Sequence, residues 1–188
     1  MKKKLWHSAI YTDYGRVKVI NKKVEDILNA QINKEFYSAY LYLAMSAHFD
    51  EIGLKGFSHW TKVQAKEEVD HGMILFNYVI ERDGNVDLRQ IESPTRTFEN
   101  PTQIFEMILE HEKKVTSGIN SIAELSESEC DVATRHFINW YITEQVEEEA
   151  NVLDVLKKLK MFGTDSQILY HIDKELNKRE YKPHCNKD

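Results

Sequence analysis

The chain has 188 residues with 41% apolar and 30% charged residues, enough to bury the core of a single soluble domain. The formal net charge of −6 argues against nucleic acid as the main partner. No apolar run is long enough to span a membrane, and the two cysteines form no Cys-x-x-Cys motif, which is typical of a reducing compartment such as the cytoplasm. Only 7 Gly and 3 Pro, with many Glu, Lys, Leu and Ile, predict an all-α fold.

Residues 1–18 begin with three lysines and mix aromatic with polar residues, without the continuous apolar stretch of a signal peptide. We expect a surface arm or a disordered extension, with docking to a partner as the alternative. Residues 19–182 are expected to form the folded domain, and residues 183–188 a carboxy-terminal tail.

Two long helical segments come first in the folded domain. Asn21 is suited to cap a helix that runs to about Glu51, and Gly53 ends it. The second helix covers residues 54–82 and stops at Gly84, a favourable residue for the turn that follows a helix. Residues 84–100 are polar, lack a sustained period and predict a loop.

Asn100-Pro101 then provides a cap followed by a proline in the first turn, which predicts the start of a third long helix. This helix continues to about Leu125, and residues 126–131 form the next break. The fourth helix runs to about Phe162 and is closed by Gly163; Thr164 or Asp165 caps a short fifth helix that reaches about Arg179.

Loop lengths predict how these helices are arranged. Short links make the first and second helices, and the third and fourth helices, antiparallel hairpins. The loop of roughly sixteen residues between the second and third helices reaches about 50 Å at about 3.3 Å per residue, which exceeds the length of a helix of about 40 Å. A crossover of this kind makes those two helices parallel. The sequence therefore predicts a ferritin-like four-helix bundle with one long crossover and a short fifth helix.

Each long helix carries a glutamate inside its apolar stripe, close to the middle of the helix. Midpoints of helices of similar length meet in a bundle, so these side chains are expected in one buried layer. The residues are Glu35 in the first helix, Glu68 with His71 in the second, Glu112 in the third, and Glu144 with Glu148 in the fourth.

Such a layer is expected to hold cations or to carry protons, because unpaired charges in an apolar core cost many kcal/mol, and a bound metal ion is the more economical of the two explanations. Glu68 and His71 lie three residues apart, share one helix face and are suited to hold one metal ion. Many carboxylates with a single imidazole favour iron or manganese over zinc, which prefers nitrogen and sulfur ligands.

Several motifs together resemble a non-haem ferritin of the bacterial type, over residues 19–181. Asn151 stands where many related dinuclear-iron proteins complete a second Glu-x-x-His, and Val69 stands where bacterioferritins have a haem-ligating Met, so no haem is expected. The motifs are the runs 35–42 (EFYSAYLY) and 45–50 (MSAHFD), Glu67-Glu68-x-x-His71, His111-Glu112 and Glu144-Gln145.

The resemblance implies a dinuclear iron centre and a third iron site. Glu68 would bridge the two irons, Gln145 would lie beside them, and Tyr42 and Trp140 are candidate electron donors, or ordinary core aromatic residues. The implied ligands are Glu35, Glu68 and His71 for the first iron, Glu112 and Glu148 for the second, and Glu67, Glu144 and Glu147 for the third.

The resemblance also implies a homo-oligomeric shell of 24 subunits, with the short last helix near the four-fold axes. Arg135 and Ile138 align with acidic residues that line the three-fold channel of animal ferritins, which puts that route for iron in doubt. Glu127, Glu129 and Asp131 are the alternative acidic opening, or form a solvated helix start.

The function implied is iron storage: the chain would oxidise Fe²⁺ with dioxygen and deposit ferric mineral inside the shell. The first alternative is a dinuclear-iron oxidase or peroxidase that stores no mineral. A structural shell subunit that binds little iron is a third possibility, against which the intact residues Glu35, Glu68, His71, Glu112 and Gln145 argue.

Overall fold

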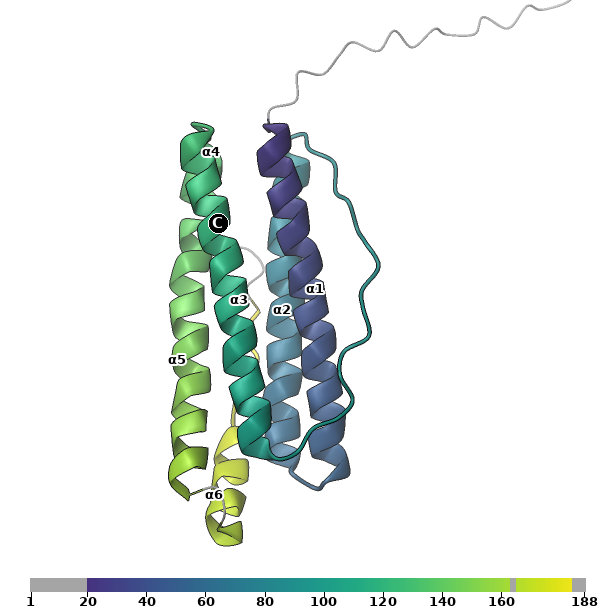
Figure 1. The fold of residues 1–188 in the computed structure, drawn as a ribbon, viewed down its shortest axis with the longest axis vertical. Coiled ribbons are helices and arrows are strands. Elements are labelled where there is room, and N and C mark those ends of the chain that lie inside the picture. Colours follow the sequence, from purple (N-terminus) through teal and green to yellow (C-terminus); the bar gives the residue numbers. More distant parts are fainter. Residues whose placement is uncertain (1–19, 163–164, 184–188) are drawn as a thin grey trace, which may run out of the picture.

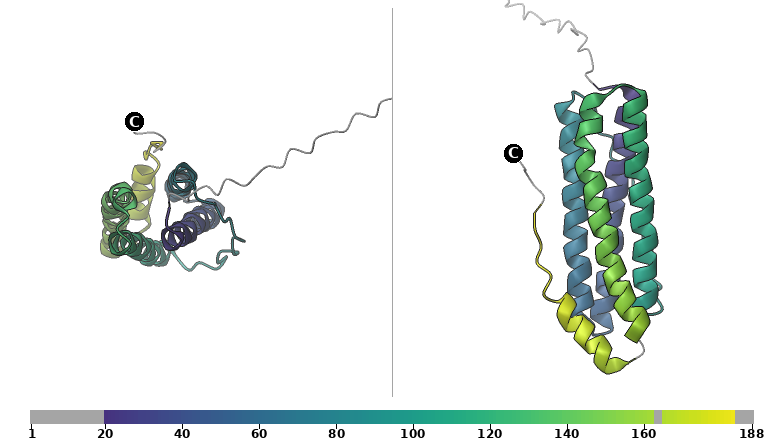
Figure 2. Two further views of the ribbon diagram at one scale, coloured as in Figure 1. Left: turned by 90° about the horizontal axis from the view of Figure 1, so that it is seen from above. Right: turned by 90° about the vertical axis from the view of Figure 1, so that its left-hand side faces the viewer.

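The computed structural model describes residues 20–162 and 165–183, and every regular element in this part of the chain is a helix. Four long columns lie side by side along one axis, and a short helix packs across one end (Figures 1 and 2). The predicted all-α bundle with a short last helix is confirmed. The elements are α1 (Lys22–Glu51), α2 (Lys55–Glu81), α3 (Pro101–Ser128), α4 (Val132–Phe137), α5 (Asn139–Phe162) and α6 (Ser166–Leu176).

The predicted amino-terminal caps are present. The Asn21 side chain accepts a hydrogen bond from the Lys23 amide at 2.8 Å, and the Asn100 side chain accepts one from the Gln103 amide at 2.9 Å. Asp165 caps α6 in the same way, while the expectations for Gly163 and Thr164 lie outside the described residues, as do those for residues 1–18 and 184–188. These side-chain oxygens satisfy amides that have no partner within the helix.

Left-handed residues end three of the helices. Gly53 after α1 has φ 85°, whereas Asp83 after α2 and Cys130 after α3 both have φ 57°. Asp83 therefore takes the turn position that we expected of Gly84. Gly84 instead approaches the helix closely, because its amide donates to the Val79 carbonyl at 2.9 Å and an added Cβ would lie 2.9 Å from the Val79 side chain.

The fourth predicted helix is interrupted at Ile138, which separates α4 from α5. The Asp131 side chain caps α4 by accepting a hydrogen bond from the Thr134 amide at 3.0 Å. Neither glycine nor proline marks the interruption, so the apolar pattern predicted one continuous helix. Two ends also differ by a few residues: α3 continues to Ser128 rather than Leu125, and α6 ends at Leu176 rather than Arg179.

The crossover from α2 to α3 runs along the outside of α1 from one end of the bundle to the other, so α2 and α3 are parallel as predicted (Figure 1). Two asparagines of α1 fix its backbone. Asn29 accepts from the Asp87 amide at 2.7 Å and donates to the Asn85 carbonyl at 2.8 Å, and Asn33 accepts from the Arg89 amide at 2.7 Å. These bonds replace the partners that an extended segment lacks outside a sheet.

Two apolar clusters fill the bundle, one toward each end. The lower cluster in Figure 1 contains Phe49, Phe57, Phe105, Met45 and Val155, and the upper cluster contains Leu28, Ile32, Leu75, Ile119 and Ile138. Between them lies a polar layer, at the height that the sequence predicted. None of the described helices combines the length and the low polarity needed to cross a membrane.

Candidate metal centre

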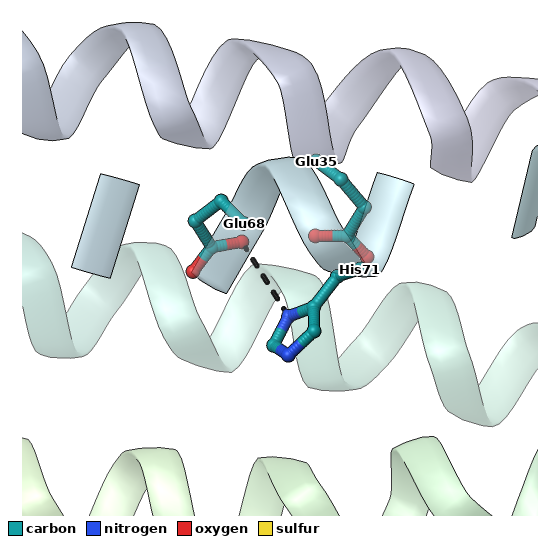
Figure 3. A group of neighbouring side chains, drawn as sticks. All are labelled: Glu35, Glu68 and His71. Carbon is teal, nitrogen blue, oxygen red and sulfur yellow. Dashed lines mark ion pairs between the residues drawn. The ribbon is translucent and has the colours of Figure 1, made fainter. Parts of the chain in front are cut away.

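Glu35 from α1 and the pair Glu68 and His71 from α2 form the centre of the polar layer (Figure 3). Their relative exposures are 0%, 1% and 2%, and one ligand atom from each lies within 4.8 Å of the others. Because metal–ligand bonds are about 2 Å long, small side-chain rotations would bring all three atoms onto one ion. The spacing of Glu68 and His71 thus gives the shared face that the sequence predicted.

Two carboxylate oxygens of this group, Glu35 Oε2 and Glu68 Oε2, are buried and accept no hydrogen bond from the described residues. Glu35 Oε1 accepts one from Gln31 Nε2 at 2.8 Å, and His71 Nδ1 lies 3.9 Å from Glu68 Oε2. A buried acceptor without a donor is costly, and a bound cation removes that cost. The donor set therefore fits a metal ion.

A second group shares the histidine with the first. Ligand atoms of His71, Glu144 and Glu148 also lie within 4.8 Å of one another. Glu148 is buried, with 3% exposure, while Glu144 is half-buried. The structure thus gathers Glu148 with Glu144 and His71, whereas the resemblance paired it with Glu112.

Glu112 is fully buried and lies between two other predicted site residues. The Tyr42 hydroxyl donates to Glu112 Oε1, and Gln145 Nε2 donates to Glu112 Oε2 at 3.3 Å. Gln145 Nε2 also donates to Thr116 Oγ1 at 3.2 Å. Both donors hold the carboxylate in the polar layer. Each oxygen keeps a second lone pair that can bind a cation.

Burial controls the electrostatics of the layer. It raises the pKa of Glu112 and that of Glu148 to about 7, and the negative charge of Glu112 adds to the effect on Glu148. Burial likewise raises the pKa of Glu35, and it raises that of Glu68 well above its ordinary value together with the charge of Glu112. Carboxyl groups that resist ionisation when empty release protons when a divalent cation binds.

The amino-acid sequence matches the ferritin-like domain family over residues 25–162. The chain belongs to the ferritin family. It is 35% identical to a bacterial non-heme ferritin of Bacteroides fragilis over 161 residues, covering 86% of this chain and 100% of the relative. A bacterial non-heme ferritin of Campylobacter jejuni is 37% identical over 155 residues, covering 82% of this chain and 93% of the relative.

Solved structures give the same result. The open pore ferritin of the hyperthermophilic archaeon Archaeoglobus fulgidus superposes with a TM-score of 0.85 at 47% identity, covering 87% of this chain and 99% of that chain. The resemblance to non-haem ferritins is therefore confirmed. Iron storage is the function of this chain, ferroxidase activity is general to its family, and an oxidase or peroxidase without mineral storage is not favoured.

The ligands expected for a third iron are not gathered into one group. Glu67 is buried, but its carboxylate pairs with the guanidinium of Arg179, and Glu147 is exposed. Of the three, Glu144 alone joins a metal-binding group among the described residues.

The sequence reasoning missed two residues of the layer. Gln64 lies in the polar part of the α2 stripe, four residues before Glu68, so its position indicated a place in the layer, although no role was predicted for it. It donates to Glu148 Oε2 at 2.7 Å. Arg179 follows α6 and carries no signal in the helical pattern, because only the fold brings it to α2.

The aromatic residues proposed as electron donors adjoin the layer. Tyr42 is fully buried, and burial raises the pKa of its hydroxyl well above the ordinary value. The Trp140 ring meets the His71 ring edge-on, with 5.5 Å between the ring centroids. Each ring thus contacts a predicted ligand: Tyr42 contacts Glu112, and Trp140 contacts His71.

Four of the five residues considered for iron uptake have other contacts in the described part of the chain, and the fifth, Glu127, is exposed. Ile138 is fully buried in the upper cluster, and Arg135 donates to Asn139 at 2.5 Å. Glu129 pairs with Lys23 at 2.6 Å, and Asp131 pairs with Arg82 at 3.1 Å. The Asp131 carboxylate also caps α4 by accepting from the Thr134 amide, as expected of a residue at a helix start.

Proposed function

We propose that this chain is itself a ferroxidase, oxidising Fe²⁺ with dioxygen at a dinuclear centre. The observation that carries the proposal is a pair of buried oxygens, Glu35 Oε2 and Glu68 Oε2, that accept no hydrogen bond within the described part of the chain. They lie beside His71 in a layer between two apolar clusters. Two ferrous ions bound together supply the two electrons that dioxygen takes up in one step.

Each predicted ligand has a role in this proposal. Glu35 and His71 hold one ferrous ion, Glu68 bridges to the other, and Glu112 and Glu148 hold the second. Oxygen donors stabilise ferric iron more than ferrous iron, so this ligand set favours loss of an electron from each. Gln145 keeps the Glu112 carboxylate in place through the 3.3 Å hydrogen bond.

Two aromatic residues complete the catalytic part of the proposal. The Tyr42 hydroxyl donates to Glu112, so it adjoins the second ferrous ion. We assign Tyr42 as a donor of a further electron, with Trp140 beside His71 as a second donor. On the α2 and α5 side of the centre, Glu67, Glu144 and Glu147 would flank a third and weaker iron position.

The proposal extends to the assembly. We propose a cytoplasmic homo-oligomer of 24 subunits without haem, in which residues 19–182 form the shell and residues 1–18 and 183–188 are appended to it. Fe²⁺ and dioxygen are the partners of the centre, and neither nucleic acid nor a membrane takes part.

Replacement of the bridging ligand tests the dinuclear assignment. Glu68→Ala should slow ferric iron formation after aerobic mixing with Fe²⁺ by at least about a hundredfold, because even residues that only orient metal ligands contribute ten- to a hundredfold. Stopped-flow absorbance measures the rate and circular dichroism the helical content. Glu110→Ala, which removes an exposed carboxylate of α3 that pairs with Lys114, is the matched control. Unchanged kinetics in Glu68→Ala would overturn the assignment.

Iron retention separates storage from oxidation alone. The apo protein is mixed with excess Fe²⁺ in air and desalted, and iron per subunit is measured. A storage shell retains far more iron than the ligands of one centre can bind. Retention of only two or three irons per subunit would instead favour the oxidase or peroxidase.

A further inference from the structure

The segment after α6, residues 177–183, folds back along α2 toward the metal centre (Figure 2, right). We call this segment the strap. His59 Nε2 donates to the Arg179 carbonyl at 2.7 Å, and the Tyr181 hydroxyl donates to Asp70 Oδ2 at 2.7 Å. Lys66 lies 5.2 Å from the centroid of the Tyr181 ring. The strap is thus attached to one face of α2 at Arg179 and at Tyr181.

The Arg179 side chain turns inward from the strap. Its guanidinium lies over the Trp60 ring, 4.5 Å from the centroid, and the side chain is 18% exposed. One nitrogen donates to Gln64 Oε1 at 2.7 Å, and the other pairs with the Glu67 carboxylate. Ring stacking and a fork of two donors are the interactions for which a guanidinium is better suited than an ammonium group.

Gln64 connects this guanidinium to the metal centre. Since Arg179 donates to Gln64 Oε1, the amide nitrogen of Gln64 must face the other way. That nitrogen donates to Glu148 Oε2 at 2.7 Å and to Glu68 Oε1 at 3.4 Å. A single side chain, that of Gln64, therefore links Arg179 to the proposed bridging carboxylate of Glu68 and to Glu148, a proposed ligand of the second iron.

The Arg179 side chain turns toward a buried carboxylate although exposed carboxylates lie closer to it along the chain. A groove of about 590 Å³ runs between the strap, α2 and α5, and its walls include Asp154, Glu175 and Glu180. The last two are exposed: Glu180 belongs to the strap itself, and Glu175, which pairs with Lys158, lies two residues before it. The guanidinium instead reaches Glu67, which is buried with 6% exposure and belongs to the proposed third iron position.

We propose that Arg179 is a resident cation of the metal centre, which occupies the third iron position by pairing with Glu67 whenever the strap lies on α2. This inference rests on the proposed function, because it concerns the same carboxylate layer. An iron ion at the third position would compete with the guanidinium for the Glu67 carboxylate, because the two positive charges repel each other at this short range. The strap thereby limits the resting centre to two tightly bound metal ions.

Metal binding to the apo protein, measured by isothermal titration calorimetry with Zn²⁺ and with anaerobic Fe²⁺, tests the inference. Wild type should bind two ions tightly per subunit. Arg179→Gln removes the cation and should bind a third with a dissociation constant at least about tenfold lower than that of any third ion in wild type. Lys178→Gln removes one positive charge from an exposed position of the same strap and is the matched control.

A second variant addresses the strap without changing the layer. Tyr181→Phe removes only the hydroxyl that donates to Asp70, so the strap should detach more readily and the third ion should bind more tightly than in wild type, though less tightly than in Arg179→Gln. An unchanged third affinity in both variants would overturn the inference, as would an equal gain in Lys178→Gln.

The same titrations separate this inference from the proposed function. Two tight ions in wild type with an unchanged third affinity in the Arg179 variant reject the role of Arg179 and leave the dinuclear centre in place. The absence of any tight binding in wild type rejects the dinuclear centre, and the inference with it. A third ion that binds wild type as tightly as the first two rejects the inference alone.

Discussion

The lower cluster and the metal centre are built on the same helices, but the cluster stabilises the folded chain, whereas the centre is suited to bind cations. Phe49 and Met45 continue the α1 stripe that contains Glu35, and Phe57 begins the α2 stripe that leads to Glu68. In the lower cluster the rings of Phe49 and Phe57 contact each other with centroids 5.1 Å apart. In the metal centre, the buried oxygens Glu35 Oε2 and Glu68 Oε2 accept no hydrogen bond from the described residues.

This difference separates stability from affinity. Apolar packing lowers the free energy of the folded chain, whereas the empty carboxylate layer raises it and thereby favours cation binding. The two clusters above and below the layer must supply the stability that the layer lacks. Changes in the clusters and changes in the layer should consequently have opposite effects on the apo chain.

The largest expected effect is on the pH dependence of apo stability. Burial holds the pKa of Glu67, of Glu112 and of Glu148 at about 7, above the ordinary value of 4.5. Between these values the folded chain binds more protons than the unfolded chain, so the free energy of unfolding falls as pH rises. Each group contributes up to roughly 1.4 kcal/mol per pH unit between these two values, and the three together up to roughly 10 kcal/mol from pH 4.5 to 8.

Urea unfolding of the apo chain at a series of pH values measures this dependence. A titration with saturating Zn²⁺ is the control, because a bound cation requires ionised carboxylates and should reverse the slope. If the free energy of unfolding changed with pH equally with and without the metal, the empty carboxylate layer would not be the source of the pH dependence.

Removing a ring from the lower cluster should have the next largest effect. Phe49→Ala leaves a cavity between Phe57 and Phe105, and we expect a loss of about 3–5 kcal/mol in the free energy of unfolding. The loss should be the same at pH 5 and pH 8, since no titrating group is removed. Where the variant remains folded, its rate of ferrous oxidation should stay within about twofold of wild type. A large loss of oxidation in the folded variant would show that the two regions are not separable.

Replacing one carboxylate of the layer should have the opposite sign. Glu112→Gln keeps an acceptor for the Tyr42 hydroxyl and removes the charge, so we expect the apo chain to gain up to about 3 kcal/mol at pH 8 and almost nothing at pH 5. Glu110→Gln, an exposed position on the same helix, should change neither value. A loss of stability at pH 8 in Glu112→Gln would contradict the view that the layer destabilises the empty chain.

The helices, their caps and the height of the polar layer could be predicted from the sequence, because each depends on local pattern. Asn21 and Asn100 cap their helices through local contacts that do not depend on the tertiary fold. Glu35, Glu68 and Glu112 lie in apolar stripes, so they become buried when the helices pack. The crossover followed from its length alone.

Contacts that depend on irregular backbone could not be predicted. The inward turn of Arg179 requires the strap to fold back along α2, and no period in residues 177–183 encodes that path. Glu147 illustrates the same limit in a helix: it lies one residue from buried Glu148, and a turn of about 100° per residue leaves it exposed. The interruption at Ile138 has no local marker either.

The smallest expected effect lies outside both regions and sets the baseline for comparing them. Cys130 ends α3 with φ 57°, a conformation that a side chain disfavours, and its side chain is exposed. Cys130→Gly should raise the free energy of unfolding by about 0.5–1 kcal/mol, equally at pH 5 and pH 8, with no change in ferrous oxidation. Cys130→Ala removes the thiol but keeps the Cβ, so it should give no gain. Equal gains in both variants would assign the effect to the thiol, and a gain confined to one pH would show that this turn is coupled to the carboxylate layer.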